Sequence, residues 1–69
     1  MDSHRSHRRL LRLHHVVHLT GLSRATIYRL MTEKKFPKQI MLTERSVGWD
    51  EDAIQNWIVA KLEGRSFSI

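Results

Sequence analysis

The sequence contains no cysteine, so neither a disulfide framework nor a thiolate metal site can stabilise the chain. It also lacks any apolar run near the roughly 18 residues that a membrane-spanning helix needs. The N-terminal stretch MDSHRSHRRLL has no apolar segment of the kind found in secretory signals. With 69 residues, the chain can form one small domain but cannot enclose a substrate cavity of ordinary size. We therefore expect a single-domain cytoplasmic protein without a membrane partner.

Residue groups that support catalysis are missing as well. The sequence has no candidate nucleophile–base pair, no glycine-rich phosphate loop and no grouped carboxylates apart from the run at residues 50–52. We expect neither an enzymatic activity nor a cofactor. His14 and His18 are four residues apart, a spacing that can bind a metal from one helix face. Because no further ligand follows near this pair, a solvated helix face explains the histidines better than a metal site.

Positive charge is in excess and is unevenly placed along the chain. The net charge is +5, with a sequence pI near 10.5. Residues 1–49 carry most of the lysines and arginines, whereas residues 50–69 hold four carboxylates against two cations. A polyanionic partner would therefore contact the first two thirds of the chain. The alternative on charge alone is a basic surface that only keeps the protein in solution.

The stretch LTGLSRATIYRLM, residues 19–31, is typical of a helix-turn-helix. Gly21 supplies the backbone freedom that a sharp turn between helices commonly needs. Ser23 can cap the second helix by accepting a hydrogen bond from a free backbone N–H. The apolar side chains that follow share one face at helical spacing: Ile27, Leu30 and Met31.

The opposite face of this second helix suits the major groove of DNA, because it combines cationic, aromatic and small side chains. These residues are Arg24, Ala25, Tyr28, Arg29 and Thr32. Arg24 and Arg29 are the best candidates for guanine contacts, since a guanidinium can bond O6 and N7 together. The helix should run from about residue 24 to residue 34 and end before Phe36 and Pro37. Lys34 and Lys35 near its end are favoured by the helix dipole, and phosphate contact is an equal alternative.

The elements around the helix-turn-helix can also be predicted. Residues 1–9 form a mobile basic arm that either lies on DNA or has no role, and an extended segment follows at residues 10–13. A short first helix then begins, with Leu22 closing over its end. Its apolar residues are Leu13, Val16 and Val17, and its exposed residues are His14, His15 and His18.

After the second helix the apolar period changes from helical to two. Ile40 alternates with Leu42, and Val47 alternates with Trp49, which predicts a β-hairpin with residues 43–46 as its loop. A hairpin at this place with Arg45 at its tip is interpreted as a wing that contacts phosphates or the minor groove. The alternative is an exposed Arg45 that pairs with Glu44.

A last helix should begin at Asp50 as its N-cap, with Glu51 and Asp52 favoured in its first turn. Gly64 can close this helix. Its predicted buried stripe comprises Ile54, Trp57, Ile58 and Leu62. Both tryptophans, Trp49 and Trp57, are interpreted as core residues rather than binding residues. The remaining residues, 65–69, form a tail.

The predicted fold is therefore mainly α with a small β-hairpin, a winged helix-turn-helix of the order α-α-β-β-α spanning residues 10–64. In this order and spacing the chain resembles the AlpA-type phage and prophage regulators, relatives of excisionases within the MerR-like winged-helix group. The matching pieces are Leu13–Val17, Thr20-Gly21-Leu22-Ser23, Thr26-Ile27-Tyr28-Arg29, Phe36-Pro37-Lys38, Val47-Gly48-Trp49 and Ile54–Trp57.

The resemblance implies a site-specific DNA-binding protein of a bacterial mobile element. Such proteins activate transcription, for example of an integrase gene, or bend DNA as directionality factors during excision. By position, base reading would fall to residues of the second helix, with Ser23 near a phosphate and the wing at residues 44–46. Thr43 and Glu44 stand where the family usually has a basic, glycine-containing tip. The full set of predicted DNA-binding residues is Ser23, Arg24, Ala25, Thr26, Tyr28, Arg29, Lys35, Arg45 and Ser46.

Two further partners are compatible with the sequence. One is an integrase or another protein bound by a small interaction module without specific DNA recognition. The other is a second copy of the chain on repeated DNA sites, because so small a domain makes few base contacts. Salt dependence distinguishes DNA binding from binding to a protein partner. The logarithm of the DNA affinity falls with the logarithm of the salt concentration, with a slope near −0.9 per neutralised phosphate.

Overall fold

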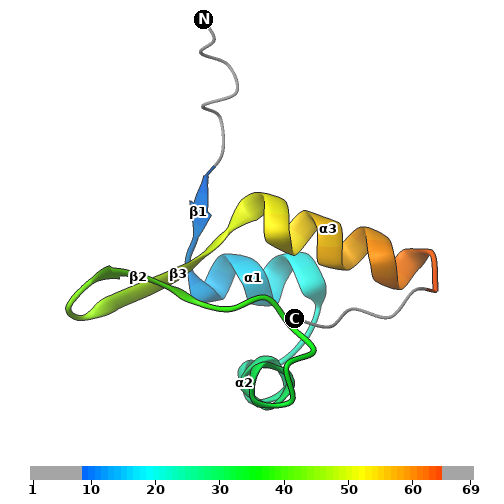
Figure 1. Ribbon diagram of the computed structural model, residues 1–69, viewed down its shortest axis with the longest axis horizontal. Helices are drawn as coiled ribbons and strands as arrows, with labels where there is room; N and C mark the ends of the chain where they lie inside the picture. Colours follow the sequence, from blue (N-terminus) through cyan, green and yellow to red (C-terminus); the bar gives the residue numbers. More distant parts are fainter. Residues whose placement is uncertain (1–8, 65–69) are drawn as a thin grey trace, which may run out of the picture.

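The computed structural model describes residues 9–64, so residues 1–8 of the arm predicted at residues 1–9 and the tail predicted at residues 65–69 lie outside this range. The predicted order of two helices, a hairpin and a third helix is confirmed (Figure 1). The extended segment before the first helix is a short strand. The elements in chain order are β1 Leu10–Leu11, α1 Leu13–Thr20, α2 Arg24–Thr32, β2 Ile40–Thr43, β3 Ser46–Asp50 and α3 Glu51–Leu62.

The sheet has three strands, whereas the sequence predicted only the two of the hairpin. All neighbours are antiparallel in the order β1-β3-β2, with Leu11 opposite Trp49 and Ile40 opposite Gly48. Gly48 lets β1 approach closely, because a Cβ at this position would lie 2.8 Å from the carbonyl oxygen of Leu11. Gly48, a glycine inside a predicted strand, was therefore the feature of the sequence that could have indicated the close approach of a third strand.

The core is built between the three helices and the base of the sheet. Its fully buried side chains are Val16, Ile27, Phe36, Trp49 and Ile54. The prediction that both tryptophans belong to the core is confirmed, since Trp49 is fully buried and Trp57 is only 6% exposed. Leu13, Val17, Leu22, Leu30, Met31 and Ile58 pack around this centre.

The loop between α2 and β2 is fixed by hydrogen bonds from both indole rings. Trp49 Nε1 donates to the carbonyl oxygen of Pro37 at 3.1 Å, and Trp57 Nε1 donates to that of Lys35 at 2.9 Å. Between these points, the ring of Phe36 meets that of Trp57 edge to face, with centroids 4.9 Å apart. Phe36 therefore does more than end a helix, because it anchors the segment that follows α2 in the core.

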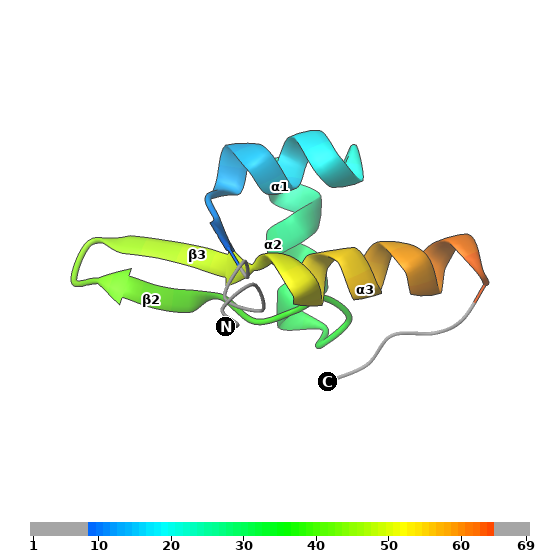
Figure 2. The same cartoon turned by 90° about the horizontal axis from the view of Figure 1, so that it is seen from above.

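One prediction about a buried position is wrong. Leu62, assigned to the buried stripe of the last helix, is 80% exposed, because α3 extends beyond the core (Figure 2). Ala60 is buried near this end of the helix instead. Ile40, which the sequence placed only in the alternating pattern of the hairpin, is 41% exposed, because β2 is an outer strand of a hairpin that projects from the helices (Figure 2). None of the helices between residues 9 and 64 is long and apolar enough to span a bilayer.

The second helix ends two residues earlier than predicted, at Thr32. Lys34 adopts a left-handed conformation with φ of 60°, and its N–H donates to the carbonyl of Met31. The N–H of Lys35 donates to the carbonyl of Leu30, which completes a Schellman motif. A lysine at the left-handed position costs about 1–2 kcal/mol relative to glycine.

Candidate functional site

The turn between α1 and α2 is held by local hydrogen bonds. Gly21 has φ of 76° and its N–H donates to the carbonyl of Val17 at 2.9 Å, which confirms the glycine-centred turn. Thr20 Oγ1 donates to the carbonyl of Val16 at 2.8 Å and accepts from the N–H of Leu22 at 3.1 Å. This double role of Thr20 was missed from the sequence. Together these bonds fix the angle at which α2 leaves α1.

Ser23 is the N-cap of α2, as predicted. Its Oγ accepts from the N–H of Thr26 at 3.1 Å and donates to Thr26 Oγ1 at 3.0 Å. Both hydroxyls are therefore engaged at the start of the helix. The first turn of α2 contains no acidic residue, and Arg24 stands at the positive end of the helix dipole. An anion is thus favoured at this end of α2.

The solvent face of α2 carries the side chains that the sequence assigned to it. Arg24, Ala25 and Arg29 are exposed, whereas Tyr28 is half-buried. Tyr28 Oη accepts a hydrogen bond from Gln39 Nε2 at 2.9 Å. This bond orients the phenol and leaves its own proton free to donate to an acceptor outside the protein.

A groove of about 500 Å³ runs between α1, α2 and the hairpin. It brings together three of the predicted site residues, Arg24 and Tyr28 of α2 and Arg45 of the hairpin turn. Arg12, which the sequence analysis did not select, lies there as well. Among residues 9–64, no carboxylate lines this groove, whose lining is Arg12, Leu13, His14, Arg24, Tyr28, Arg45 and Val47.

The basic residues differ in whether a carboxylate pairs with them. Arg29 Nη1 lies 3.4 Å from Glu33 Oε2, and Lys35 Nζ lies 3.8 Å from Glu33 Oε1. Within residues 9–64, the three arginines of the groove make no ion pair. The alternative in which Arg45 pairs with Glu44 is therefore not seen in the described part of the chain.

The remaining predicted residues lie outside the groove lining. Ala25 and Arg29 are on the exposed face of α2, and Thr26 is engaged with the cap. Lys35 follows the C-terminal end of α2, and Ser46 is half-buried at the start of β3. The predicted residues thus lie in the groove, on the outer face of α2, at the ends of α2 and at the start of β3.

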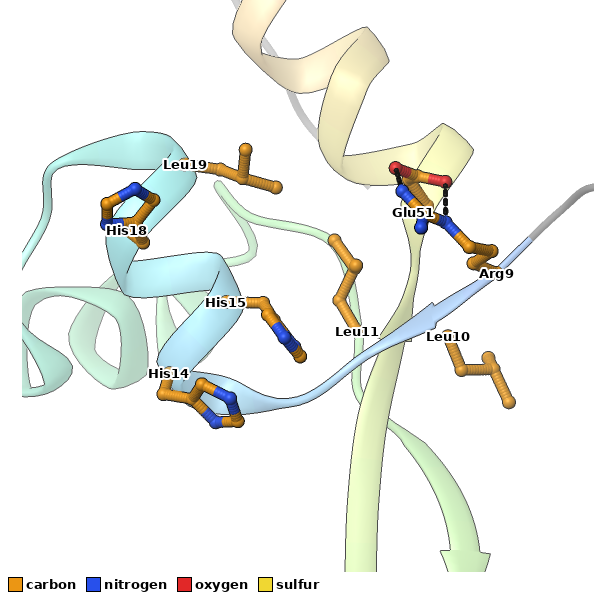
Figure 3. Close-up of a pocket in the computed structure, with 8 residues that line it drawn as sticks. All are labelled: Arg9, Leu10, Leu11, His14, His15, His18, Leu19 and Glu51. Atoms are coloured by element: carbon orange, nitrogen blue, oxygen red, sulfur yellow. Dashed lines mark hydrogen bonds and ion pairs between the residues drawn. The ribbon is translucent and has the colours of Figure 1, made fainter.

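A second hollow of about 390 Å³ lies on the other side of α1, against β1 and the start of α3 (Figure 3). His14, His15 and His18 are exposed there, as predicted. His15 Nδ1 accepts from the N–H of Arg12 at 3.4 Å, so the imidazole helps to cap α1. Among residues 9–64, no group of three or more histidine, aspartate or glutamate side chains is placed to hold a metal ion.

The border of this hollow is an ion pair between β1 and α3. Arg9 Nε and Nη2 donate to the two carboxylate oxygens of Glu51 at 3.1 and 2.9 Å. The hydrogen bond from Arg9 lowers the pKa of Glu51, against the opposing effect of its desolvation. Arg9, which the sequence placed in the arm, is also joined through its carbonyl to the N–H of Glu51 at 2.8 Å.

The short glycine turn, the capped second helix and the adjoining basic groove define a helix-turn-helix protein with one cationic face. Residues 9–62 match the family described as prophage CP4-57 regulatory protein (AlpA). The chain therefore belongs to the AlpA family, which confirms the resemblance seen in the sequence.

Two relatives support this assignment. The chain is 40% identical over 57 residues to "Uncharacterized protein ORF88" of Enterobacteria phage P4, an alignment covering 83% of this chain and 65% of the phage protein. It therefore spans slightly less than two thirds of that relative. It is 44% identical over 62 residues to "DNA-binding transcriptional activator AlpA" of Escherichia coli (strain K12), covering 81% of this chain and 89% of that protein. No solved structure matches the chain.

Proposed function

We propose that this protein is a site-specific, double-stranded DNA-binding regulator of a phage, prophage or other mobile element. In this proposal, residues 23–34 enter the major groove, and the loop at residues 43–46 acts as a wing on the backbone or in the minor groove. The observation that carries it is the basic groove, in which Arg24 and Tyr28 of α2 meet Arg45 of the hairpin without any carboxylate. Such a surface suits the phosphates that flank a recognised base sequence.

The roles within this interface follow from exposure and from existing partners. Arg24 is unpaired in the described structure and stands in the first turn, the part of a recognition helix that contacts base edges. Arg29 shares the exposed face, but it must first give up its contact with Glu33. Ala25 is small enough to allow close approach to a thymine methyl. Ser23, Thr26, Lys35 and Ser46 support the interface at its edges.

The biological output we propose is transcriptional activation, with an integrase gene as one target, or assistance to excision by bending DNA. The name of the Escherichia coli relative supports the first of these. Either role places the protein in the bacterial cytoplasm, on the nucleoid. Self-association on repeated sites and contact with an integrase belong to the same proposal.

The test begins with selection of duplexes from a random library, together with fragments around the gene that encodes the protein. The selected duplex and a scrambled control are then titrated by fluorescence anisotropy at several salt concentrations. We expect at least a hundredfold preference for the selected duplex and a clear decrease in affinity with salt. Equal affinity for both duplexes would contradict site-specific recognition. Absence of binding to either at low salt would contradict DNA binding and favour the protein-interaction alternative.

A further inference from the structure

The four arginines whose side chains border the grooves around α1 and α2 fall into two sets. Arg9 is held by Glu51 through two hydrogen bonds. Arg12, Arg24 and Arg45 have no carboxylate partner among residues 9–64, although they converge on one groove. Like charges gathered at one place without counterions repel each other, so a bound anion would stabilise such a cluster.

Arg12 is the member of this cluster whose backbone is most firmly placed. It follows β1, which pairs with β3 through Leu11 and Trp49. Its carbonyl accepts from the N–H groups of His15 and Val16 at 3.0 and 3.1 Å, so it is also the N-cap of α1. The residue itself is exposed. Because the backbone is already fixed, only the side chain of Arg12 has to be ordered when it binds a ligand.

The opposite side of the groove is formed by the hairpin. Arg45 stands in the turn between β2 and β3, where its N–H donates to Thr43 Oγ1 at 3.2 Å. Arg24 and the phenol of Tyr28 line the same groove. The groove therefore offers guanidinium donors from the start of α1, from α2 and from the hairpin, and one hydroxyl donor from α2.

We propose that this groove binds a phosphodiester strand and that Arg12 is a backbone anchor which contacts a phosphate in the groove that it shares with Arg45. The inference rests on the proposed function and adds a contact outside the helix-turn-helix and the hairpin. A guanidinium binds phosphate oxygens through two parallel hydrogen bonds, a geometry that carries no information about base sequence. Arg12 lies at the N-cap of α1, outside the proposed recognition helix α2, so we expect it to contribute to affinity but not to the choice of site.

The experiment compares Arg12→Ala with Lys61→Ala, a control that removes the same charge from α3, outside the groove lining. Affinities for the selected and the scrambled duplex are measured at four salt concentrations, after circular dichroism has shown that each variant is folded. For Arg12→Ala we expect about a tenfold loss of affinity for both duplexes near 0.1 M salt. The salt slope should become shallower by about 0.9, which corresponds to one phosphate. Lys61→Ala should match the wild type.

Arg12→Lys provides a second variant that keeps the charge. It should recover the salt slope but only part of the affinity, because an ammonium lacks the paired donors of a guanidinium. If Arg12→Ala and Lys61→Ala have equal DNA affinities and equal salt slopes, the anchor role of Arg12 is overturned and the proposed function remains intact. A loss confined to the selected duplex would also overturn it, because Arg12 would then read sequence. If the wild type bound no DNA, both the anchor and the proposed function would be overturned.

Discussion

The helices α2 and α3 begin in the same way but differ in the charges of their first turns. Each has an N-cap in extended conformation, and the cap side chain accepts from a backbone N–H: Ser23 from Thr26 and Asp50 from Asp52. The first turn of α3 then carries two carboxylates, on Glu51 and Asp52, whereas that of α2 carries none. Negative charge at a helix N-terminus is stabilising, so only α3 is optimised in this respect.

This difference distinguishes a helix whose own sequence compensates its N-terminal dipole from a helix whose first turn carries no negative charge. α3 contributes Ile54 and Trp57 to the core and satisfies its own dipole. α2 has no acidic residue at its positive end and places Arg24 there, in the groove that it shares with two further arginines without an ion pair among residues 9–64. A DNA phosphate at this end would supply the charge that α3 carries in its own sequence.

The largest expected effect comes from removing the buried face of α3. Trp57→Ala should reduce the free energy of unfolding by about 3–5 kcal/mol, because it leaves a cavity beside Phe36 and removes the donor to the carbonyl of Lys35. Guanidinium unfolding followed by circular dichroism measures this loss. Leu62→Ala on the same helix is the control and should change stability by less than about 0.5 kcal/mol, since Leu62 is exposed. Equal losses in the two variants would show that α3 does not stabilise the fold through this face.

Arg24→Glu tests the comparison directly, because it gives α2 the acidic first turn of α3. Affinity for the selected duplex should fall by more than about 1–3 kcal/mol, since a contact is lost and a repulsive charge is added. The same substitution should raise the free energy of unfolding by about 0.3–1 kcal/mol through the helix dipole. Titration with DNA and thermal unfolding of the same preparation measure the two effects.

Lys38→Glu is the matched control for this reversal, because Lys38 is exposed and does not line the groove. It should weaken DNA binding much less than Arg24→Glu does and leave the dipole of α2 unchanged. A decrease in both stability and affinity for Arg24→Glu would mean that the arginine has a structural role in α2.

The features that the sequence predicted are those fixed by neighbouring residues. Gly21, Ser23 and Asp50 act through backbone groups within four residues, so turn and cap chemistry revealed them. Helix spacing likewise placed Ile27 in the core and Arg24 on the solvent face. The charged face of α2 could therefore be described before the structure was known.

The features that were missed depend on contacts between distant residues. Arg12 reaches the groove because β1 pairs with β3, a register that two residues of extended chain do not reveal. The exposure of Leu62 and Ile40 follows from where the core ends, since each fits an apolar period that continues past it. Which arginines pair with a carboxylate also depends on the fold. Glu33 is four residues from Arg29 and pairs with it on the same helix, but it is too far along the helix to pair with Arg24 in the groove.

The two N-caps allow a smaller comparison between the helices. Ser23→Ala and Asp50→Ala should each lower the free energy of unfolding by about 1 kcal/mol, because a backbone N–H loses its acceptor. Asp50→Ala should cost more, since it also removes a negative charge from the N-terminus of α3. Thermal unfolding at low and high salt measures this difference, which should shrink as salt screens the charge. A larger loss for Ser23→Ala would contradict the assignment of α3 as the electrostatically optimised helix.

The smallest expected effect concerns Glu51, whose carboxylate joins the first turn of α3 to Arg9. The hydrogen bond from Arg9 lowers the pKa of Glu51 below its usual value of 4.5, so folding favours the deprotonated form. The resulting stabilisation is complete above the pKa of the unfolded chain and disappears as the pH falls through the lower pKa of the folded state. Its size is modest, because the Arg9 side chain is 70% exposed.

In thermal unfolding between about pH 7 and pH 2.5, Glu51→Gln should have a lower Tm than the wild type near neutrality and should approach it in acid. Glu44→Gln in the hairpin turn, without an ion pair among residues 9–64, controls for the loss of a charge. A difference between Glu51→Gln and the wild type that stays constant across this range would show that the carboxylate acts on α3 through packing rather than through its charge.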